Sequence, residues 1–398
     1  MIWSLALSAL AVDVVAFPEP EPLAAVGVPR GAFSVPPAFQ WAIDLPGGVM
    51  HSATHTERTR PVVLGDALLI GSAAGRGAYL LSRSNGSLIR SYPSDDPVES
   101  EIAVSNNTIW FGDVGGTTWC YRLNGKELWH HQGTAPILSR PTVNGDTVVV
   151  VDVDGLAVAL DAETGDLVWR YQARRDLTRS AELALYAAPP AVLEKESIIL
   201  GFSDGSLVGL DATAGTELWA KRVGEGRYPD VVAEVVRAGN GVLLAAGFYG
   251  PFQAFDLASR NTLWRVEAGA ASAPTVPESG GVAWLGSTDG KLRAIATLTG
   301  AERWVWDSGD PAAALTTPQW TPAGLVVGSS TGGVWMIDPE TGREVWEFGE
   351  PYLLTGVSSV PVVADRQLLV VTNAGRLYSF LAPSASPEGE WRGPTQSR

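Results

Sequence analysis

One short stretch recurs along this 398-residue chain and constrains its fold more than any other feature. Its clearest copy, residues 154–169, reads Asp-Gly-Leu-Ala-Val-Ala-Leu-Asp-Ala-Glu-Thr-Gly-Asp-Leu-Val-Trp. The first Asp-Gly pair predicts a tight turn, because glycine adopts a positive φ without strain. The apolar residues that follow alternate with smaller ones, as in a strand, and the Thr-Gly pair predicts a second turn. The stretch is therefore a β-hairpin unit that leads into a further strand ending on tryptophan.

The interval from the turn glycine to the closing residue is 14 positions in seven copies. The pairs are Gly75–Ile89, Gly115–Trp129, Gly155–Trp169, Gly205–Trp219, Gly250–Trp264, Gly290–Trp304 and Gly332–Trp346. An eighth copy begins at residues 373–380 but has no tryptophan behind it. Residues 39–45, at the other end of the chain, carry Trp41 and supply the missing strand. An N-terminal strand that completes the last repeat closes a ring of sheets and leaves no open edge.

The repeat predicts an all-β fold, an eight-bladed β-propeller of four-stranded antiparallel blades over residues 39–381, closed by an N-terminal strand. A repeat of this period overrides the two or three domains that length alone would suggest. No single blade can bury its own faces, so stability must come from packing between neighbouring blades. We expect the recurring tryptophans to provide that packing. They are Trp41, Trp129, Trp169, Trp219, Trp264, Trp304 and Trp346.

The net charge of −15 and the single cysteine exclude several classes of function. An acidic surface repels phosphate backbones and anionic lipid headgroups, so we expect neither a nucleic-acid partner nor direct binding to a membrane surface. Cys120 has no second cysteine to pair with, which excludes an intrachain disulfide and a cysteine-based zinc site. It lies in a strand-like run, where we expect a buried small hydrophobic residue.

No group of residues in the sequence completes a catalytic or metal site. The four histidines form two separate pairs, His51 with His55 and His130 with His131, whereas zinc or iron needs three or four convergent ligands. Residues 152–155 have only part of a calcium loop, because the third acidic ligand and the distal glutamate are missing, and they are interpreted as a hairpin turn. We therefore predict a protein that is not an enzyme and needs no cofactor or metal.

The two ends of the chain differ in composition from the repeats. Residues 1–16 are apolar and predict a secretory signal peptide or, alternatively, a short uncleaved anchor. The first basic residue is Arg30, and no cysteine follows the apolar run to accept a lipid. Residues 17–38 are proline-rich and predict an extended linker, and residues 382–398 predict a disordered tail. The sequence indicates an exported protein and leaves its mode of anchoring open.

Two connections between repeats are candidates for binding a partner protein. The closing tryptophans of the third and fourth repeats are 50 residues apart, against 40 for the preceding pair, so residues 173–186 form an insertion. Its Arg175, Leu177 and Arg179 have the composition of a protein interface, and the alternative is an ordinary solvated loop. The connection into the fifth repeat ends at Asp230 and is a further candidate on the same rim. Extra loop length on a rigid scaffold is a common place for binding.

The pattern Asp-Gly-x-Leu-x-Ala-Leu-Asp-x-x-Thr-Gly-x-x-x-Trp resembles the pyrroloquinoline-quinone (PQQ) propeller repeat, most clearly in residues 154–169, 204–219 and 331–346. Among proteins with this repeat, the chain resembles the BamB family of the outer-membrane β-barrel assembly machinery. Length, blade count, the closing strand and the position of the long connection are all similar. The resemblance implies a non-enzymatic periplasmic scaffold that docks on the periplasmic domains of BamA.

The same resemblance implies other subunits of the assembly complex, and nascent outer-membrane proteins, as further partners. It implies that Leu177, Arg179 and Asp230 contact BamA. The chain departs from the family in lacking the lipidated cysteine, so attachment to the outer membrane stays open. One alternative is a quinone-dependent oxidoreductase, but those enzymes use an adjacent cysteine pair, calcium and a catalytic aspartate. The other alternative is a propeller of this repeat class that binds a different envelope partner, which the sequence does not separate from the first reading.

Overall fold

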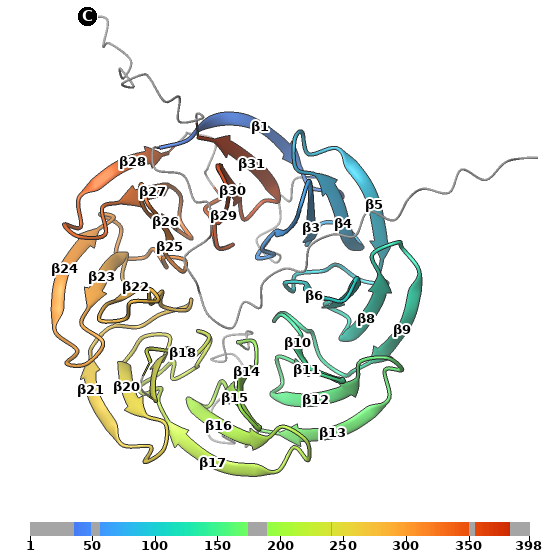
Figure 1. The fold of residues 1–398 in the computed structure, drawn as a ribbon, viewed down its shortest axis with the longest axis horizontal. Helices are drawn as coiled ribbons and strands as arrows, with labels where there is room; N and C mark the ends of the chain where they lie inside the picture. The colour runs from blue at the N-terminus through green and yellow to red at the C-terminus, as the bar shows by residue number, and fades with distance from the viewer. Residues whose placement is uncertain (1–35, 49–55, 174–188, 240, 350–354, 383–398) are drawn as a thin grey trace, which may run out of the picture.

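The structure is a computed structural model that describes residues 36–48, 56–173, 189–239, 241–349 and 355–382. Within these ranges the strands form eight sheets, arranged as blades around a central opening (Figure 1). The predicted eight-bladed β-propeller is therefore confirmed. Among the helices of this described part, none is long and apolar enough to cross a membrane.

Blades 1 to 4 each consist of four antiparallel strands, numbered here from the central opening outwards. Blade 1 contains β2 (Val62–Leu64), β3 (Ala67–Gly71), β4 (Gly77–Ser82) and β5 (Leu88–Pro93). Blade 2 contains β6 (Ala103–Ser105), β7 (Thr108–Gly112), β8 (Thr117–Arg122) and β9 (Glu127–Gln132). Blade 3 contains β10 (Thr142–Asn144), β11 (Thr147–Val151), β12 (Leu156–Asp161) and β13 (Leu167–Gln172). Blade 4 contains β14 (Val192–Glu194), β15 (Ser197–Gly201), β16 (Ser206–Asp211) and β17 (Glu217–Arg222).

Blades 5 to 8 repeat this arrangement with two variations, in blades 6 and 8. Blade 5 contains β18 (Val236–Arg237), β19 (Val242–Ala246), β20 (Phe252–Asp256) and β21 (Thr262–Val266). Blade 6 contains β22 (Ala283–Gly286), β23 (Lys291–Ile295) and β24 (Glu302–Asp307). Blade 7 contains β25 (Gln319–Thr321), β26 (Gly324–Gly328), β27 (Val334–Ile337) and β28 (Glu344–Phe348). Blade 8 contains β29 (Val362–Ala364), β30 (Gln367–Val371), β31 (Arg376–Leu381) and, outermost, β1 (Ala38–Asp44).

The innermost strand of blade 6 is reduced to a single bridge. Thr275 and Trp284 exchange two backbone hydrogen bonds, each 2.8 Å from nitrogen to oxygen. Pro274 and Pro277 flank this bridge, and proline has no backbone N–H to continue a ladder. The pair of prolines therefore shortens the strand to one position.

β1 closes the ring as the outer strand of blade 8, where it lies beside β31 although the two are more than 300 residues apart (Figure 1). The register of this pair shifts between Phe39 and Trp41, which makes Gln40 the extra residue of a β-bulge. The outer strands of blades 2 to 7 have the same bulge one residue before their tryptophan. β1 is thus equivalent in detail to the outer strand of the other blades.

The register of blade 1 corrects one assignment from the sequence. Ile89 was expected to stand in for the closing tryptophan, but it is the bulged residue of β5 and is 53% exposed. Arg90 occupies the tryptophan position instead, opposite Leu80, and its Nη1 donates to Asn124 O at 2.6 Å. The 14-residue interval missed this shift because the hairpin of blade 1 is one residue longer.

The loops define two faces of the ring. Turns between the first and second strands lie beside turns between the third and fourth, as where Ala212 N donates to Glu196 O at 2.9 Å. We call this side the turn face. The opposite side carries the turns between the second and third strands together with the connections between blades, and we call it the connector face. There Val153 N donates to Pro136 O at 3.0 Å, one of a series of backbone hydrogen bonds that join turns to connections.

Four tryptophans dock on a glycine in the third-to-fourth-strand turn of the next blade. A Cβ built on each glycine would lie 2.6–2.8 Å from the indole ring, so only glycine permits this contact. The pairs are Trp129 with Gly165, Trp169 with Gly215, Trp264 with Gly300 and Trp304 with Gly342. Each Nε1 also donates to a carbonyl in the same turn, at 2.8–3.2 Å. The glycine of this turn is therefore the residue on which the tryptophan of the preceding blade packs.

The closure between blades 8 and 1 uses a different set of contacts. Trp41 Nε1 is buried and has no hydrogen-bond partner among the described residues. Arg83 O, which holds the place of the usual acceptor, accepts instead from Gln367 Nε2 at 3.0 Å. The Arg83 guanidinium reaches back across the seam to Gln367 Oε1 at 2.7 Å and to Asp365 Oδ2 at 2.9 Å. Hydrogen bonds of Arg83 with Gln367 and Asp365 therefore join blades 1 and 8 in addition to the closing strand.

Glu57 lies fully buried on the connector face near this closure. Its carboxylate accepts hydrogen bonds from Thr59 N at 3.1 Å and from Ala73 N at 2.7 Å. In other blades the nitrogen equivalent to that of Ala73 donates to a backbone carbonyl, as Val114 N does to Pro97 O. Loss of solvent raises the pKa of Glu57 to about 7, against hydrogen bonds that lower it.

We expect Glu57 to make the protein less stable as the pH rises from about 4.5 to about 7. In this interval the unfolded chain has released the proton of Glu57 while the folded chain still holds it, so deprotonation favours unfolding. The shift corresponds to about 3 kcal/mol at most. Urea unfolding at pH 5 and pH 8 should show that Glu57→Gln removes this part of the pH dependence. An unchanged slope in that variant would contradict the assignment.

Candidate partner-binding surface

The residues predicted to bind a partner divide into two groups. Arg175, Leu177 and Arg179 lie outside the described residues, so their role stays a prediction. Asp230 is described and is fully buried in the connection between β17 and β18. Its carbonyl accepts from Phe248 N at 2.8 Å, which fixes this connection to the second-to-third-strand turn of blade 5. Direct contact between Asp230 and a partner also stays a prediction.

The connection that ends at Asp230 folds back closely on itself. A Cβ at Gly224 would lie 1.6 Å from Pro229 O, so no other residue fits at this position. Gly224 N donates to Gly205 O at 2.9 Å, and Val231 N donates to Phe202 O at 3.1 Å. Both ends of the connection are therefore held on blade 4, and residues 225–228 project as a short rigid loop on the connector face.

Three aromatic side chains and one arginine gather where this loop meets blade 5. The ring centroids of Tyr228 and Tyr249 are 5.5 Å apart at 70°, and those of Phe248 and Tyr249 are 4.8 Å apart at 66°. The Arg227 guanidinium lies 5.4 Å from the centroid of Tyr228. Tyr249 is 62% exposed and Arg227 is also exposed. We call Arg227, Tyr228, Phe248 and Tyr249 the aromatic rim cluster.

Ion pairs and hydrogen bonds hold the cluster from both sides. Arg265 in β21 pairs with Glu225 through two contacts, Nη1 to Oε1 at 2.8 Å and Nη2 to Oε2 at 2.9 Å. This pairing lowers the pKa of Glu225. On the other side, Thr288 Oγ1 donates to Phe248 O at 2.7 Å. The exposed ring of Tyr249 and the half-buried rings of Tyr228 and Phe248 are thus held on backbone that three neighbouring blades restrain.

Phe248 and Tyr249 were not among the binding residues predicted from the sequence. Their turn reads Gly-Phe-Tyr-Gly, whereas the two central positions of the equivalent turns carry no aromatic residue in the other blades. Two consecutive aromatic residues at a turn could have indicated a binding surface from the sequence alone. Tyr228 lies about 20 positions earlier in the chain, and only the fold shows that it touches Tyr249.

The central channel is a second place where charged residues converge. Its cavity of about 180 Å³ is lined by residues from all eight blades. Arg140 lies 3.7 Å from Glu101 Oε2 and 3.4 Å from Glu234 Oε1, and Arg60 lies near both acids. Loss of solvent raises the pKa of Glu234 and lowers that of Arg60. These groups form a charge-balanced network across the channel that links blades 1, 2, 3 and 5.

Cys120 lies in β8, is fully buried, and burial raises the pKa of its thiol to about 12. Asp152 accepts hydrogen bonds from Asp154 N at 3.0 Å and from Leu156 N at 2.9 Å, which stabilise the hairpin turn. Across the described ranges, no group of three or more His, Cys, Asp and Glu side chains is placed to hold a metal ion.

Comparisons with known proteins agree with this architecture. The sequence model of the family described as outer membrane protein assembly factor BamB matches residues 79–279 and 262–397. BamB of Burkholderia pseudomallei strain K96243 is 26% identical over 333 residues, which cover 80% of this chain and 83% of that protein. The crystal structure of BamB from Moraxella catarrhalis aligns with a TM-score of 0.71 and 19% identity, covering 86% of this chain and 98% of that one.

The fold is shared more widely than the family. A quinohemoprotein alcohol dehydrogenase from Pseudomonas putida HK5 aligns with a TM-score of 0.67 and 15% identity over 89% of this chain and 78% of that one. At such identities the structural likeness shows the fold alone. The repeat and the ring define a PQQ-type β-propeller. Within that class, the chain belongs to the outer membrane protein assembly factor BamB family.

Proposed function

We propose that this protein is a non-enzymatic assembly factor for outer-membrane β-barrel proteins, which works in the periplasm and docks on BamA through its connector face. The family match over most of the ring supports the assembly role. The observation that supports docking is the aromatic rim cluster, in which the exposed Tyr249 packs on two half-buried rings beside the connection that was predicted to bind. BamA, other subunits of the complex and nascent barrel proteins are the proposed partners.

The chemistry of the cluster suits a protein partner. Tyrosine and arginine are enriched among residues that dominate binding energy, because they bury large surfaces and also form hydrogen bonds. The edge-to-face contacts between Tyr249 and its neighbours restrict the rings before binding, which lowers the conformational entropy lost on docking. The cation of Arg227 at its edge favours a partner surface with acidic groups. No step in this role requires a cofactor.

Tyr249→Ala is expected to weaken binding to the purified periplasmic domains of BamA about tenfold or more, which corresponds to about 1.4 kcal/mol. Biolayer interferometry with the full chain should measure this change. The combined variant Leu177→Ala and Arg179→Glu tests the insertion separately and is also expected to weaken binding. A dissociation constant equal to that of the unmodified chain in either case would remove that surface from the proposal.

Leu298→Ala is the matched control, because Leu298 is 71% exposed and lies in a turn of blade 6 on the turn face. Its binding to BamA should not change. Affinity capture of the tagged chain from mildly solubilised envelopes then tests the function as a whole. Recovery of another envelope protein without BamA would support a different partner and contradict the proposed one.

A further inference from the structure

The seam between blades 4 and 5 departs from the tryptophan–glycine packing that four other seams share. At the turn position where Trp129, Trp169, Trp264 and Trp304 meet a glycine, blade 5 has Arg260. Arg260 adopts φ +63°, a left-handed conformation that normally favours glycine. An arginine side chain at this position excludes the usual docking of the preceding tryptophan, which is Trp219.

Trp219 packs against its own blade instead. A Cβ on Gly209, its cross-strand partner in β16, would lie 2.1 Å from Trp219 Nε1. The Arg260 guanidinium covers the indole, 4.4 Å from a ring centroid, in a cation–π contact. Two residues that differ from the repeat, Gly209 and Arg260, thus act together to place the indole on β16 and under the arginine, not on a turn glycine of blade 5.

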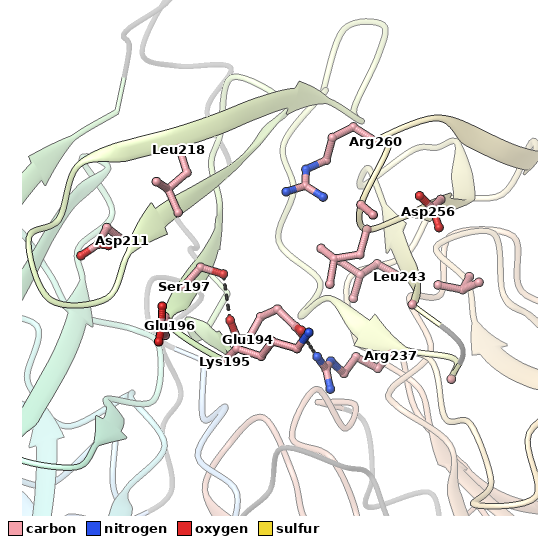
Figure 2. A pocket seen from close by; sticks show the side chains of 15 residues that line it. Glu194, Lys195, Glu196, Ser197, Asp211, Leu218, Arg237, Leu243, Asp256 and Arg260 are labelled. Carbon is pink, nitrogen blue, oxygen red and sulfur yellow. Dashed lines mark hydrogen bonds and ion pairs between the residues drawn. The ribbon is translucent and has the colours of Figure 1, made fainter.

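A groove lies beside Arg260 on the turn face (Figure 2). The aromatic rim cluster belongs to the opposite, connector face. The volume of the groove is about 1070 Å³, at the upper end of the roughly 300–1,000 Å³ common for ligand pockets. The lining includes the cations Lys195, Arg237 and Arg260 and the aliphatic side chains Leu218 and Leu243. Figure 2 shows Lys195 and Arg260 directed into the space, with Asp211 and Asp256 toward its margins.

Two of these cations hold backbone conformations that are unfavourable for them. Lys195 has φ +56° in the first turn of blade 4, where the equivalent residues of blades 1 and 3 are Gly65 and Gly145. The described non-glycine residues with left-handed φ are otherwise Asn or Asp, which tolerate this region. Lysine and arginine in this region are each strained by about 1 kcal/mol or more. Lys195 and Arg260, the two strained cations, both line this one groove.

Three of the four acidic residues of the lining are engaged by neighbouring groups, and the fourth, Glu196, is exposed beside Lys195. Glu194 forms an ion pair with Arg237. Asp211 Oδ1 accepts from the backbone nitrogens of its own turn at 2.8–2.9 Å, and Asp256 Oδ1 accepts from Ser259 N at 2.6 Å. By contrast, Arg260 Nε is buried without a hydrogen-bond partner among the described residues, and loss of solvent lowers the pKa of Arg260.

We propose that this groove binds an acidic, extended peptide segment of a partner protein. Carboxylates of the segment would pair with Lys195 and Arg260, and an aliphatic side chain would pack on Leu218, which is 56% exposed. The groove is lined by residues of blades 4 and 5. The aliphatic side chains of Leu218 and Leu243 beside these cations suit a peptide that carries both acidic and aliphatic side chains.

The test uses the full chain and a fluorescein-labelled peptide, Glu-Glu-Leu-Glu-Glu-Leu, in fluorescence anisotropy. Arg260→Gly restores the residue of the repeat and should weaken binding about tenfold or more. Lys195→Gly should weaken it about fivefold. Both variants should unfold at the same or a higher urea concentration than the unmodified chain, because each removes a strained conformation. A merely structural role for Arg260 would instead lower the stability of Arg260→Gly.

Arg343→Ala is the matched control, since Arg343 is an exposed cation in the equivalent turn of blade 7. It should bind the peptide like the unmodified chain, and the glutamine peptide Gln-Gln-Leu-Gln-Gln-Leu should bind at least tenfold more weakly. The proposal is overturned if the acidic peptide does not bind, or if Arg260→Gly binds it unchanged. It is also overturned if Arg343→Ala loses as much affinity, or if phosphatidylglycerol vesicles bind in an Arg260-dependent way and the peptide does not.

Discussion

A chain that begins at Leu45, and therefore lacks β1, is expected to lose about 5 kcal/mol or more of its free energy of unfolding. The deletion removes Phe39, whose ring lies 6.2 Å from that of Phe380, together with Trp41 and the whole β1–β31 ladder. β31 then becomes an exposed edge strand, which favours self-association. Urea unfolding followed by circular dichroism, with size-exclusion chromatography, should show a lower midpoint and oligomers.

A chain that begins at Pro36 is the control for this deletion, because it keeps every described strand. It should unfold at the same urea concentration as the full chain. A synthetic peptide of residues 36–46, added to the chain that lacks β1, should restore the midpoint by adding the missing strand. If the chain without β1 is a monomer with unchanged stability, then β1 does not contribute to the free energy of unfolding and the prediction is wrong.

The number of blades and the mode of closure were predictable from the sequence because the repeat encodes them locally. A turn glycine and a tryptophan at a fixed interval specify one hairpin and one outer strand, and the incomplete last copy requires a strand from the other end. The same logic failed by one residue in blade 1, where Arg90 and not Ile89 takes the tryptophan position. A count of residues does not reveal how a longer hairpin shifts the register.

The details of the two candidate surfaces were not predictable in the same way. Gly209 and Arg260 are both visible in the sequence as departures from the repeat, but they lie 51 positions apart. Only the packed seam shows that both act on Trp219. Likewise, the contact between Tyr228 and Tyr249 depends on the hydrogen bond from Phe248 N to Asp230 O. Such contacts arise between blades, and sequence periodicity describes single blades.

Departures from the repeat and candidate surfaces coincide in blades 4 and 5. The connector face there carries the aromatic rim cluster, and the turn face carries the groove beside Arg260. In a ring of equivalent units, stability requires only the repeated contacts, and binding requires that some units differ. The contribution of the tryptophan–glycine contact to the free energy of unfolding must therefore be known before the seam at Trp219 can be interpreted.

Trp169→Ala is expected to lower the free energy of unfolding by about 4 kcal/mol, whereas Trp219→Ala should lower it by only about half as much. Trp169 is 7% exposed, docks on Gly215 of the next blade and donates from Nε1 to Ala212 O at 3.0 Å. Trp219 is half-buried and packs on its own blade. Urea unfolding of both variants measures the difference, which estimates what docking across a seam contributes.

The glycine side of this contact supplies an independent test with a matched control. Gly215 and Gly145 have similar φ values, +66° and +58°, but a Cβ on Gly215 would lie 2.6 Å from the Trp169 ring, whereas nothing lies within 4 Å of one on Gly145. Gly215→Ala should therefore destabilise the protein by about 2 kcal/mol more than Gly145→Ala, since both share the backbone strain. In the Trp169→Ala background this difference should disappear, because the clashing ring is absent. Equal effects of the two glycine substitutions in the unmodified chain would show that the tryptophan–glycine contact does not hold the blades together.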